Sequence, residues 1–132
     1  MHFHEISFRV RYGETDQMGV VYHGNYAQYL EMGRVEWLRS FGISYKSMEE
    51  NGIMLPVISL SIQYIKPAVY DQLIRVRTHL KNIPTVRISF AYEIEDETGE
   101  LLASAESDLA FLDTRTRKPV RPPAELMEKL LE

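Results

Sequence analysis

The stretch N-Y-A-Q-Y-L-E-M-G-R-V-E-W-L-R-S-F-G, residues 25–42, decides the fold of this chain. Its apolar positions recur at steps of three or four residues: Tyr26, Leu30, Gly33, Trp37 and Phe41, with Tyr29 and Leu38 beside them. This period is typical of one buried face of an α-helix. Asn25 is a candidate N-cap with Gln28 at the capping-box position, and Gly42 is a candidate stop. We predict a helix of about 16 residues, roughly 24 Å long.

Gly33 lies on the apolar face of this helix. A glycine in a helix costs about 1 kcal/mol relative to alanine. Its presence therefore indicates that the helix backbone approaches another layer closely there, and a β-sheet is the flattest such layer.

Most of the remaining chain alternates between apolar and polar residues, which is the period of half-buried strands. The alternating runs cover residues 3–11, 58–64, 74–81, 86–95 and 101–111, and short helices are expected at 44–50 and 124–131. Tight turns between the later runs predict an antiparallel meander. A lone helix must bury its apolar face against the one available sheet. We predict an α+β fold in which a five-stranded antiparallel sheet wraps one long central helix, as a single domain spanning residues 1–132.

Composition excludes several classes of function. The chain has 132 residues, no Cys and a net charge of −4. It therefore has no disulfide, no thiolate nucleophile and no Cys-based metal site, and its charge has the wrong sign for a general nucleic-acid binder. No apolar run approaches the roughly 20 residues that a membrane-spanning helix needs. The N-terminus lacks the pattern of a signal peptide, so we expect a cytoplasmic protein.

The densest group of chemically active side chains is Y-G-E-T-D-Q-M-G-V-V-Y-H-G-N-Y, residues 12–26. It runs directly into the start of the predicted helix, where free backbone N–H groups and the helix dipole stabilise negative charge. Such a position can hold a developing oxyanion. Asp16 lies just upstream and is a candidate nucleophile or general base.

The segment E-T-D-Q-M-G-V-V-Y-H-G-N-Y at 14–26 resembles the signature of the 4-hydroxybenzoyl-CoA thioesterase-like hotdog family. E-M-G-R at 31–34, V-I-S-L-S-I-Q-Y-I-K-P-A at 57–68 and D-T-R-T-R-K-P-V-R-P-P at 113–123 extend the resemblance over essentially the whole chain. The sequence is most similar to the branch of bacterial acyl-CoA thioesterases that is associated with the Tol–Pal system. The resemblance implies a hotdog fold, hydrolysis of acyl-CoA thioesters, and a homodimer or homotetramer with sites at subunit interfaces.

The resemblance also assigns site residues. It implies Asp16 as the catalytic carboxylate, a backbone N–H of His23 or Gly24 as the oxyanion donor, and an assisting role for the His23 side chain. Tyr22 flanks this group and is a candidate catalytic residue with Asp16 and His23, while Gly24 and Asn25, which matches a polar residue at the helix start, are candidates for substrate binding. CoA is anionic and needs cations, although no tight motif fixes which ones. Arg87 and Arg117 are the candidates that we name for substrate binding, and the other basic residues considered are Lys66, Lys81, Arg115 and Lys118. No cofactor beyond the CoA of the substrate is implied.

Several residues have simpler explanations. Asp16 suits a turn, and Glu14 suits a structural or solvated acid. Tyr22 and Tyr26 suit the core, while Glu31 and Glu36 suit a solvated helix face. His2 and His4 share one strand face, but two histidines without further ligands do not predict a metal site.

Two other functions remain open at this point. One is a hydratase or dehydratase that acts on acyl thioesters, although its His-centred motif is missing. The other is a non-catalytic module that binds acyl-CoA or an acyl carrier protein. Asp16 argues against the binding module, because binding alone gives no reason for a carboxylate beside a thioester carbonyl.

Overall fold

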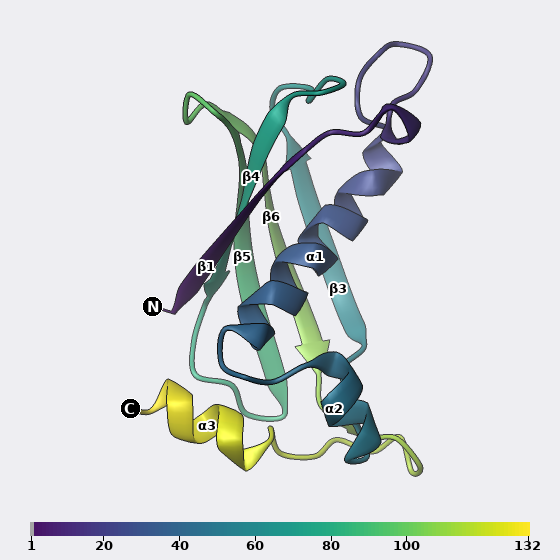
Figure 1. Cartoon of the computed structure of the whole chain (residues 1–132). Coiled ribbons are helices and arrows are strands. Elements are labelled where there is room, and N and C mark those ends of the chain that lie inside the picture. The colour runs from purple at the N-terminus through teal and green to yellow at the C-terminus, as the bar shows by residue number, and fades with distance from the viewer. Residues whose placement is uncertain (1) are drawn as a thin grey trace.

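The computed structural model describes residues 2–132, in which the long helix α1 (Tyr26–Arg39) lies across a five-stranded antiparallel sheet (Figure 1). The strands of this sheet are β1 (Phe3–Arg9), β3 (Val57–Tyr64), β4 (Leu73–Leu80), β5 (Arg87–Asp96) and β6 (Leu101–Ala110). The shorter elements are the 3-10 helices η1 (Tyr12–Glu14) and η2 (His23–Asn25), α2 (Tyr45–Glu50), α3 (Ala124–Leu130), and the paired strands β2 (Ile53–Met54) and β7 (Leu112–Asp113). The predicted α+β class and hotdog arrangement are confirmed.

The strand order β1-β4-β5-β6-β3 corrects the predicted meander. β4, β5 and β6 pair consecutively as expected, but β3 lies beside β6 at one edge, and β1 takes the place next to β4. The cause is residues 65–72, which carry the chain past the start of α1 toward β1. Val21 N donates to Ala68 O at 2.8 Å, and Asp71 N donates to Val10 O at 2.9 Å. These bonds direct the chain toward β1. The next strand, β4, therefore pairs with β1 rather than with β3.

The apolar face of α1 packs on the sheet, as predicted, and its backbone comes closest to β1 and β4. Tyr29, Leu30 and Trp37 are fully buried there, and the Trp37 ring meets Phe90 edge-on at 5.0 Å between centroids. Gly33 is the point of closest approach, because a Cβ at this position would lie 2.5 Å from Thr78 Oγ1 on β4. The predicted approach of helix backbone to sheet is confirmed.

The start of α1 differs from its prediction. Asn25 does not cap the helix with its side chain, and the capping box with Gln28 does not form. Instead η2 leads into the 14-residue α1, and Asn25 Nδ2 donates to Glu14 O at 2.8 Å. The side chain that suits an N-cap therefore fastens the preceding loop. At the other end Gly42 has a φ of 77° and donates to Arg39 O, so the predicted stop is confirmed.

β3 is poorly covered on either face. It lies at the edge of the sheet with one hydrogen-bonded neighbour, β6, while the backbone of α1 comes closest to β1 and β4. Val57, Leu60 and Tyr64 are 46%, 40% and 52% exposed. The chain thus leaves an apolar edge strand uncovered.

The C-terminal helix α3 closes the far end of the core with Leu126 and Leu130. His2 holds it there, because its Nε2 lies 3.1 Å from Leu130 O while its own carbonyl accepts a hydrogen bond from Trp37 Nε1 at 3.2 Å. His2 thus has a structural role in this fold. Within residues 2–132, no helix has the length and apolar character required to cross a membrane.

Candidate active site

Asp16 lies at the base of a tight loop that precedes α1. Thr15 and Val21 pair as an antiparallel bridge, and Asp16 N donates to Val20 O at 2.9 Å. Asp16 Oδ1 accepts a 2.9 Å hydrogen bond from Met18 N, which is an Asx turn. Oδ2 accepts no hydrogen bond from residues 2–132, and the side chain is half-buried. One carboxylate oxygen therefore fixes the loop and the other is free for a ligand.

Glu14 fastens this loop to α1. Its carboxylate accepts hydrogen bonds from Arg11 N at 2.8 Å, from the Arg11 guanidinium and from Tyr29 Oη at 2.9 Å. Its carbonyl oxygen accepts from Tyr22 N and from Asn25 Nδ2. Burial opposes ionisation of Glu14, but the bonds from Arg11 and Tyr29 outweigh it and lower the pKa. Glu14 is thus a buried structural carboxylate, the simpler of the two roles that the sequence allowed.

The helix start offers two unused backbone donors. Asn25 N donates to Tyr22 O, and Tyr26 N donates to His23 O. The N–H groups of His23 and Gly24 donate no hydrogen bond to any residue of the described range 2–132. They are therefore available to an oxyanion at the positive end of the helix dipole.

Aromatic side chains surround these donors. A Cβ on Gly24 would lie 2.6 Å from Cε2 of Tyr22, so the Tyr22 ring lies directly against Gly24. The Tyr22 and His23 rings are 4.5 Å apart between centroids. Tyr64, at the end of β3, donates its hydroxyl to His23 O at 3.3 Å. Sequence reasoning missed Tyr64 because it reads only as one more apolar position of an alternating strand.

The bridge between Thr15 and Val21 brings most of the predicted site together. It places the Asp16 backbone beside Val20 and Val21, directly before the residues that begin the helix, and we call Asp16, Tyr22, His23, Gly24 and Asn25 the cluster at the start of α1. Tyr22 and His23 are exposed, and Asn25 is half-buried with its side chain engaged to Glu14. Tyr26 is buried in the core, which is the structural role that the sequence also allowed for it.

Arg87 and Arg117 lie elsewhere within the chain. Arg87 pairs with Ala110 at one end of β6, whereas Tyr64 pairs with Ala103 toward the other end. Seven residues of strand separate them, which is about 23 Å. Arg117 is exposed in the loop after β7. A single chain therefore does not bring either arginine to Asp16, and their role in binding stays a prediction.

Lys66 is the predicted cation nearest in sequence to the strand end at Tyr64. Its Nζ forms a 2.9 Å ion pair with Glu100, and both side chains are about half exposed. The hydrogen bond and charge of Glu100 raise the pKa of Lys66. Lys81 is likewise paired, with Glu106 at 2.9 Å.

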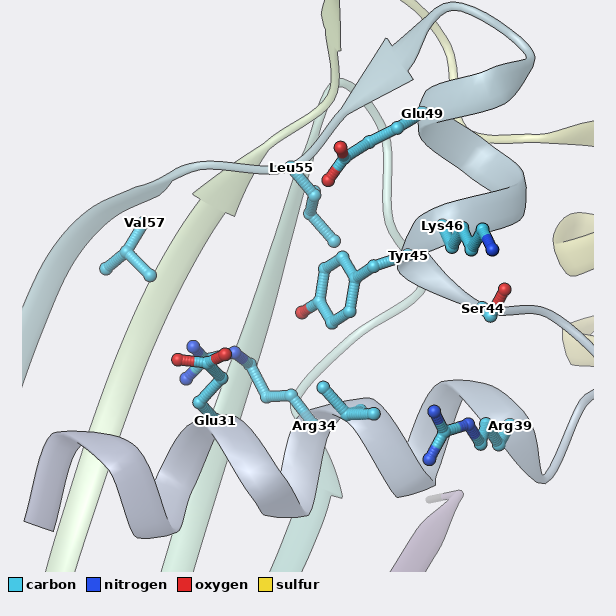
Figure 2. Close-up of a pocket in the computed structure, with 10 residues that line it drawn as sticks. Glu31, Arg34, Arg39, Ser44, Tyr45, Lys46, Glu49, Leu55 and Val57 are labelled. Atoms are coloured by element: carbon cyan, nitrogen blue, oxygen red, sulfur yellow. The ribbon is translucent and has the colours of Figure 1, made fainter.

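A second feature that the sequence analysis missed is a buried arginine in α1. Arg34 is 6% exposed, and its Nη1 donates to Tyr92 Oη at 3.1 Å. It lines a cavity of about 690 Å³ between α1, α2 and the start of β3 (Figure 2). Glu31 lines the same cavity from the exposed side of α1, while Glu36 pairs with Arg39 at 2.6 Å on the solvated face. The sequence feature that could have identified Arg34 is a basic residue located between Gly33 and Trp37 of the apolar stripe.

Among residues 2–132, no group of three or more His, Cys, Asp or Glu side chains could hold a metal ion. His4 lies half-buried on β1, and His2 binds the C-terminal helix. The cluster at the start of α1 thus offers a free carboxylate oxygen, two backbone N–H donors and an exposed imidazole. These are groups that acyl transfer uses: a nucleophile or base, and donors for the charge that develops on a carbonyl oxygen.

Comparison with known proteins agrees with this chemistry. The sequence model of the Thioesterase-like superfamily matches residues 10–130. The chain is 36% identical over 121 residues to YneP of Bacillus subtilis, covering 92% of this chain and 88% of that protein. It is 33% identical over 119 residues to the acyl-CoA thioesterase YbgC of Haemophilus influenzae, covering 89% and 87%.

A solved structure extends the comparison to three dimensions. The DHNA-CoA thioesterase from Staphylococcus aureus superposes with a TM-score of 0.87 at 37% identity, covering 92% of this chain and 81% of that one. The sequence match and the shared architecture lead to the same family that the motif at 14–26 indicates. The chain belongs to the Thioesterase-like superfamily.

Proposed function

We propose that this protein hydrolyses acyl-CoA thioesters to a free acid and CoA, with Asp16 as the catalytic carboxylate. The observation that carries the proposal is the cluster at the start of α1. Asp16 keeps one carboxylate oxygen free at the base of its loop, and the N–H groups of His23 and Gly24 are unused. The names of the relatives, acyl-CoA thioesterase and DHNA-CoA thioesterase, support the thioester as the substrate class.

The proposed reaction needs no metal and no serine. Asp16 either attacks the thioester carbonyl carbon or takes a proton from a water that attacks it. The carbonyl π electrons move to oxygen, and the backbone donors at His23 and Gly24 bind that oxyanion. As the carbonyl re-forms, the C–S bond breaks and its electron pair leaves with sulfur as the CoA thiolate. If Asp16 attacks, the resulting anhydride is hydrolysed in a second step that regenerates the carboxylate.

The neighbouring residues have supporting roles in this proposal. The exposed His23 imidazole assists proton transfer, and Tyr22 and Gly24 shape the place where the thioester carbonyl lies. Asn25 keeps the loop against the helix start through Glu14 O, at 2.8 Å. His23→Ala keeps the backbone donor and removes only the ring, so its effect on kcat reports the side chain alone.

We further propose that the protein acts as a homodimer joined through β3. The strand exposes apolar residues and has a free edge, and such edges invite pairing with another chain. A two-fold axis through the strand makes the two copies of β3 antiparallel. With full overlap, Val57 of one copy lies beside Tyr64 of the other. Cations from a neighbouring copy, Arg87 and Arg117 among those to test, can then reach CoA.

The experiment is release of free thiol from a panel of aliphatic and aromatic acyl-CoA thioesters. Hydrolysis with turnover supports the proposal. Binding of acyl-CoA without thiol release would instead identify a binding module. Conversion of an enoyl or hydroxyacyl thioester without thiol release would identify a hydratase or dehydratase. The same panel presented on an acyl carrier protein tests that alternative carrier.

A further inference from the structure

The cavity between α1, α2 and β3 has a composition that the proposed hydrolysis does not explain. It measures about 690 Å³ and is lined by Arg34, Tyr45, Leu55 and Val57, among others. Figure 2 shows the Tyr45 ring pointing from α2 toward Glu31 and Arg34 on α1. Leu55 and Val57 give the cavity an apolar wall, and Arg34 is its one buried cation. The other charged residues of the lining are Glu31, Glu49, Lys46 and Arg39.

Arg34 is a buried positive charge without an acidic partner. Of the residues in the described range 2–132, none places a carboxylate oxygen within 4.0 Å of its guanidinium. Its Nη1 donates to the neutral hydroxyl of Tyr92, and its Nε is buried with no acceptor. Burial disfavours the charged form, but the Tyr92 and Tyr45 hydroxyls outweigh this and raise the pKa of Arg34. The guanidinium therefore stays charged.

An unpaired buried charge is costly, so proteins normally pair it. The neighbouring groups hold Arg34 in place rather than neutralise it. The Tyr92 hydroxyl lies 2.5 Å from Ser107 Oγ, and Ser107 is 2% exposed. Arg39, which also lines the cavity, already has a partner in Glu36. Arg34 is thus a fixed cation with hydrogen-bond donors to spare, facing a space large enough for a ligand.

We propose that this cavity receives the far end of the acyl group, and that the group it selects there is a carboxylate. The substrates it favours are then CoA thioesters of dicarboxylic acids. The guanidinium of Arg34 binds the terminal carboxylate, and Leu55 and Val57 contact the methylene chain. This inference rests on the proposed thioesterase function and names its substrate class.

The pairing of β3 edges supplies the route to the cavity. Within one chain Val57 lies at the opposite end of β3 from Tyr64, which contacts His23. In the antiparallel dimer the partner's Val57 lies beside Tyr64. The partner's cavity, which contains the partner's Arg34, therefore lies next to the Asp16 loop. Each site takes its carboxylate from one copy and its acyl pocket from the other.

The first test compares matched substrates with the unaltered protein. The pairs are succinyl- and butyryl-CoA, adipoyl- and hexanoyl-CoA, and suberoyl- and octanoyl-CoA, which differ within each pair only in the terminal group. We expect the carboxyl-ended member to have a kcat/KM roughly 10- to 150-fold higher in the pair whose length fits, which is the worth of a hydrogen bond to a charged group. Equal or better hydrolysis of the methyl-ended member in every pair would overturn the proposal.

The second test uses Arg34→Met with Arg39→Met as its control. Both remove one cation from the lining of the cavity, but Arg39 is exposed and paired. We expect Arg34→Met to lose the preference for the carboxyl end while it keeps activity on the methyl-ended partner, and Arg39→Met to keep the preference. An equal loss on both substrates would assign Arg34 a purely structural role. If Arg34→Met fails to fold, the comparison of matched substrates with the unaltered protein still tests the proposed preference for a carboxyl end.

A third test addresses the shared site. Asp16→Asn and Arg34→Met chains carrying different tags are expressed together, and mixed dimers are purified. One site in each mixed dimer then has both Asp16 and the partner's Arg34, so about half of the original activity on the carboxyl-ended substrate should return. No recovery would overturn the assignment of the cavity to the partner. A protein that hydrolyses only methyl-ended thioesters refutes this inference alone, whereas one that hydrolyses no thioester refutes the proposed function as well.

Discussion

The hydroxyl of Tyr29, in the first turn of α1, donates a 2.9 Å hydrogen bond to the buried carboxylate of Glu14, which lies ahead of the loop that carries Asp16. The backbone carbonyl of the same glutamate accepts hydrogen bonds from Tyr22 N and Asn25 Nδ2, both of which follow the loop. The pair therefore ties the segment that leads into the Asp16 loop to α1, at whose start the N–H groups of His23 and Gly24 lie unused. The hydrogen bond between Tyr29 and Glu14 therefore helps to set the position of the Asp16 loop relative to the start of α1.

Tyr29→Phe should therefore weaken the fold and the site together. The change removes one donor to a buried charged group, which typically costs about 1.5–3 kcal/mol. We expect urea unfolding to report a loss in that range, and kcat to fall as the Asp16 loop loosens. Tyr12→Phe is the control, because Tyr12 is 77% exposed and belongs to the same segment. Equal stability of the two variants would show that the hydroxyl of Tyr29 does not support the loop.

The stability of the protein should depend on pH through Glu14. Hydrogen bonds from Arg11 and Tyr29 lower the pKa of this carboxyl below its ordinary value of 4.5, against the effect of burial. A lowered pKa contributes stability that is present above the unfolded value and is lost as the pH falls through the folded value. The free energy of unfolding should therefore exceed that of Glu14→Gln at pH 7, and the gap should narrow below pH 4.5. A constant gap from pH 7 to pH 3 would contradict this linkage.

Gly33→Ala should destabilise the protein although alanine favours helices. The new Cβ would lie 2.5 Å from Thr78 Oγ1 and 3.0 Å from Val76 Cγ1, so these side chains or the helix itself must shift. Such overpacking typically costs about 1–3 kcal/mol. Thermal unfolding checks this, with Gly13→Ala as the control because nothing lies within 4 Å of a Cβ there. Adding Thr78→Ala should restore part of the loss, and its failure to do so would place the strain elsewhere.

Periodicity in the sequence is enough to predict α1, its closeness to the sheet at Gly33 and most of the strands, because each follows from a local pattern. Strand order does not follow from local pattern. β3 lies beside β6 because residues 65–72 form hydrogen bonds to Val21 and Val10. The alternation of apolar and polar residues does not predict these contacts. The candidate site divides in the same way. Asp16 and His23 are carried by a contiguous motif, whereas Tyr64 and Arg34 reach their positions only through tertiary pairing.

Disrupting the edge of β3 should separate the proposed dimer. Leu60 is 40% exposed on this strand, and a lysine there opposes pairing with a second chain. We expect Leu60→Lys to reduce the mass in light scattering to that of one 15.4 kDa chain and to lose thioesterase activity. Phe3→Lys makes the same kind of change on β1, at the opposite edge, and should leave the assembly intact. A dimer that survives Leu60→Lys would place the interface elsewhere.

The most direct test of the account is the turnover of Asp16→Asn on the best acyl-CoA substrate of the panel. Asparagine keeps the Oδ1 acceptor for Met18 N, so the loop and the melting temperature should not change. Asp113→Asn is the matched control, because Asp113 also accepts backbone N–H bonds in a turn, at the other end of the sheet. We predict that Asp16→Asn lowers kcat by about 100-fold or more while Asp113→Asn does not. A folded Asp16→Asn protein that keeps more than about a tenth of the original kcat would contradict the assignment of the catalytic carboxylate.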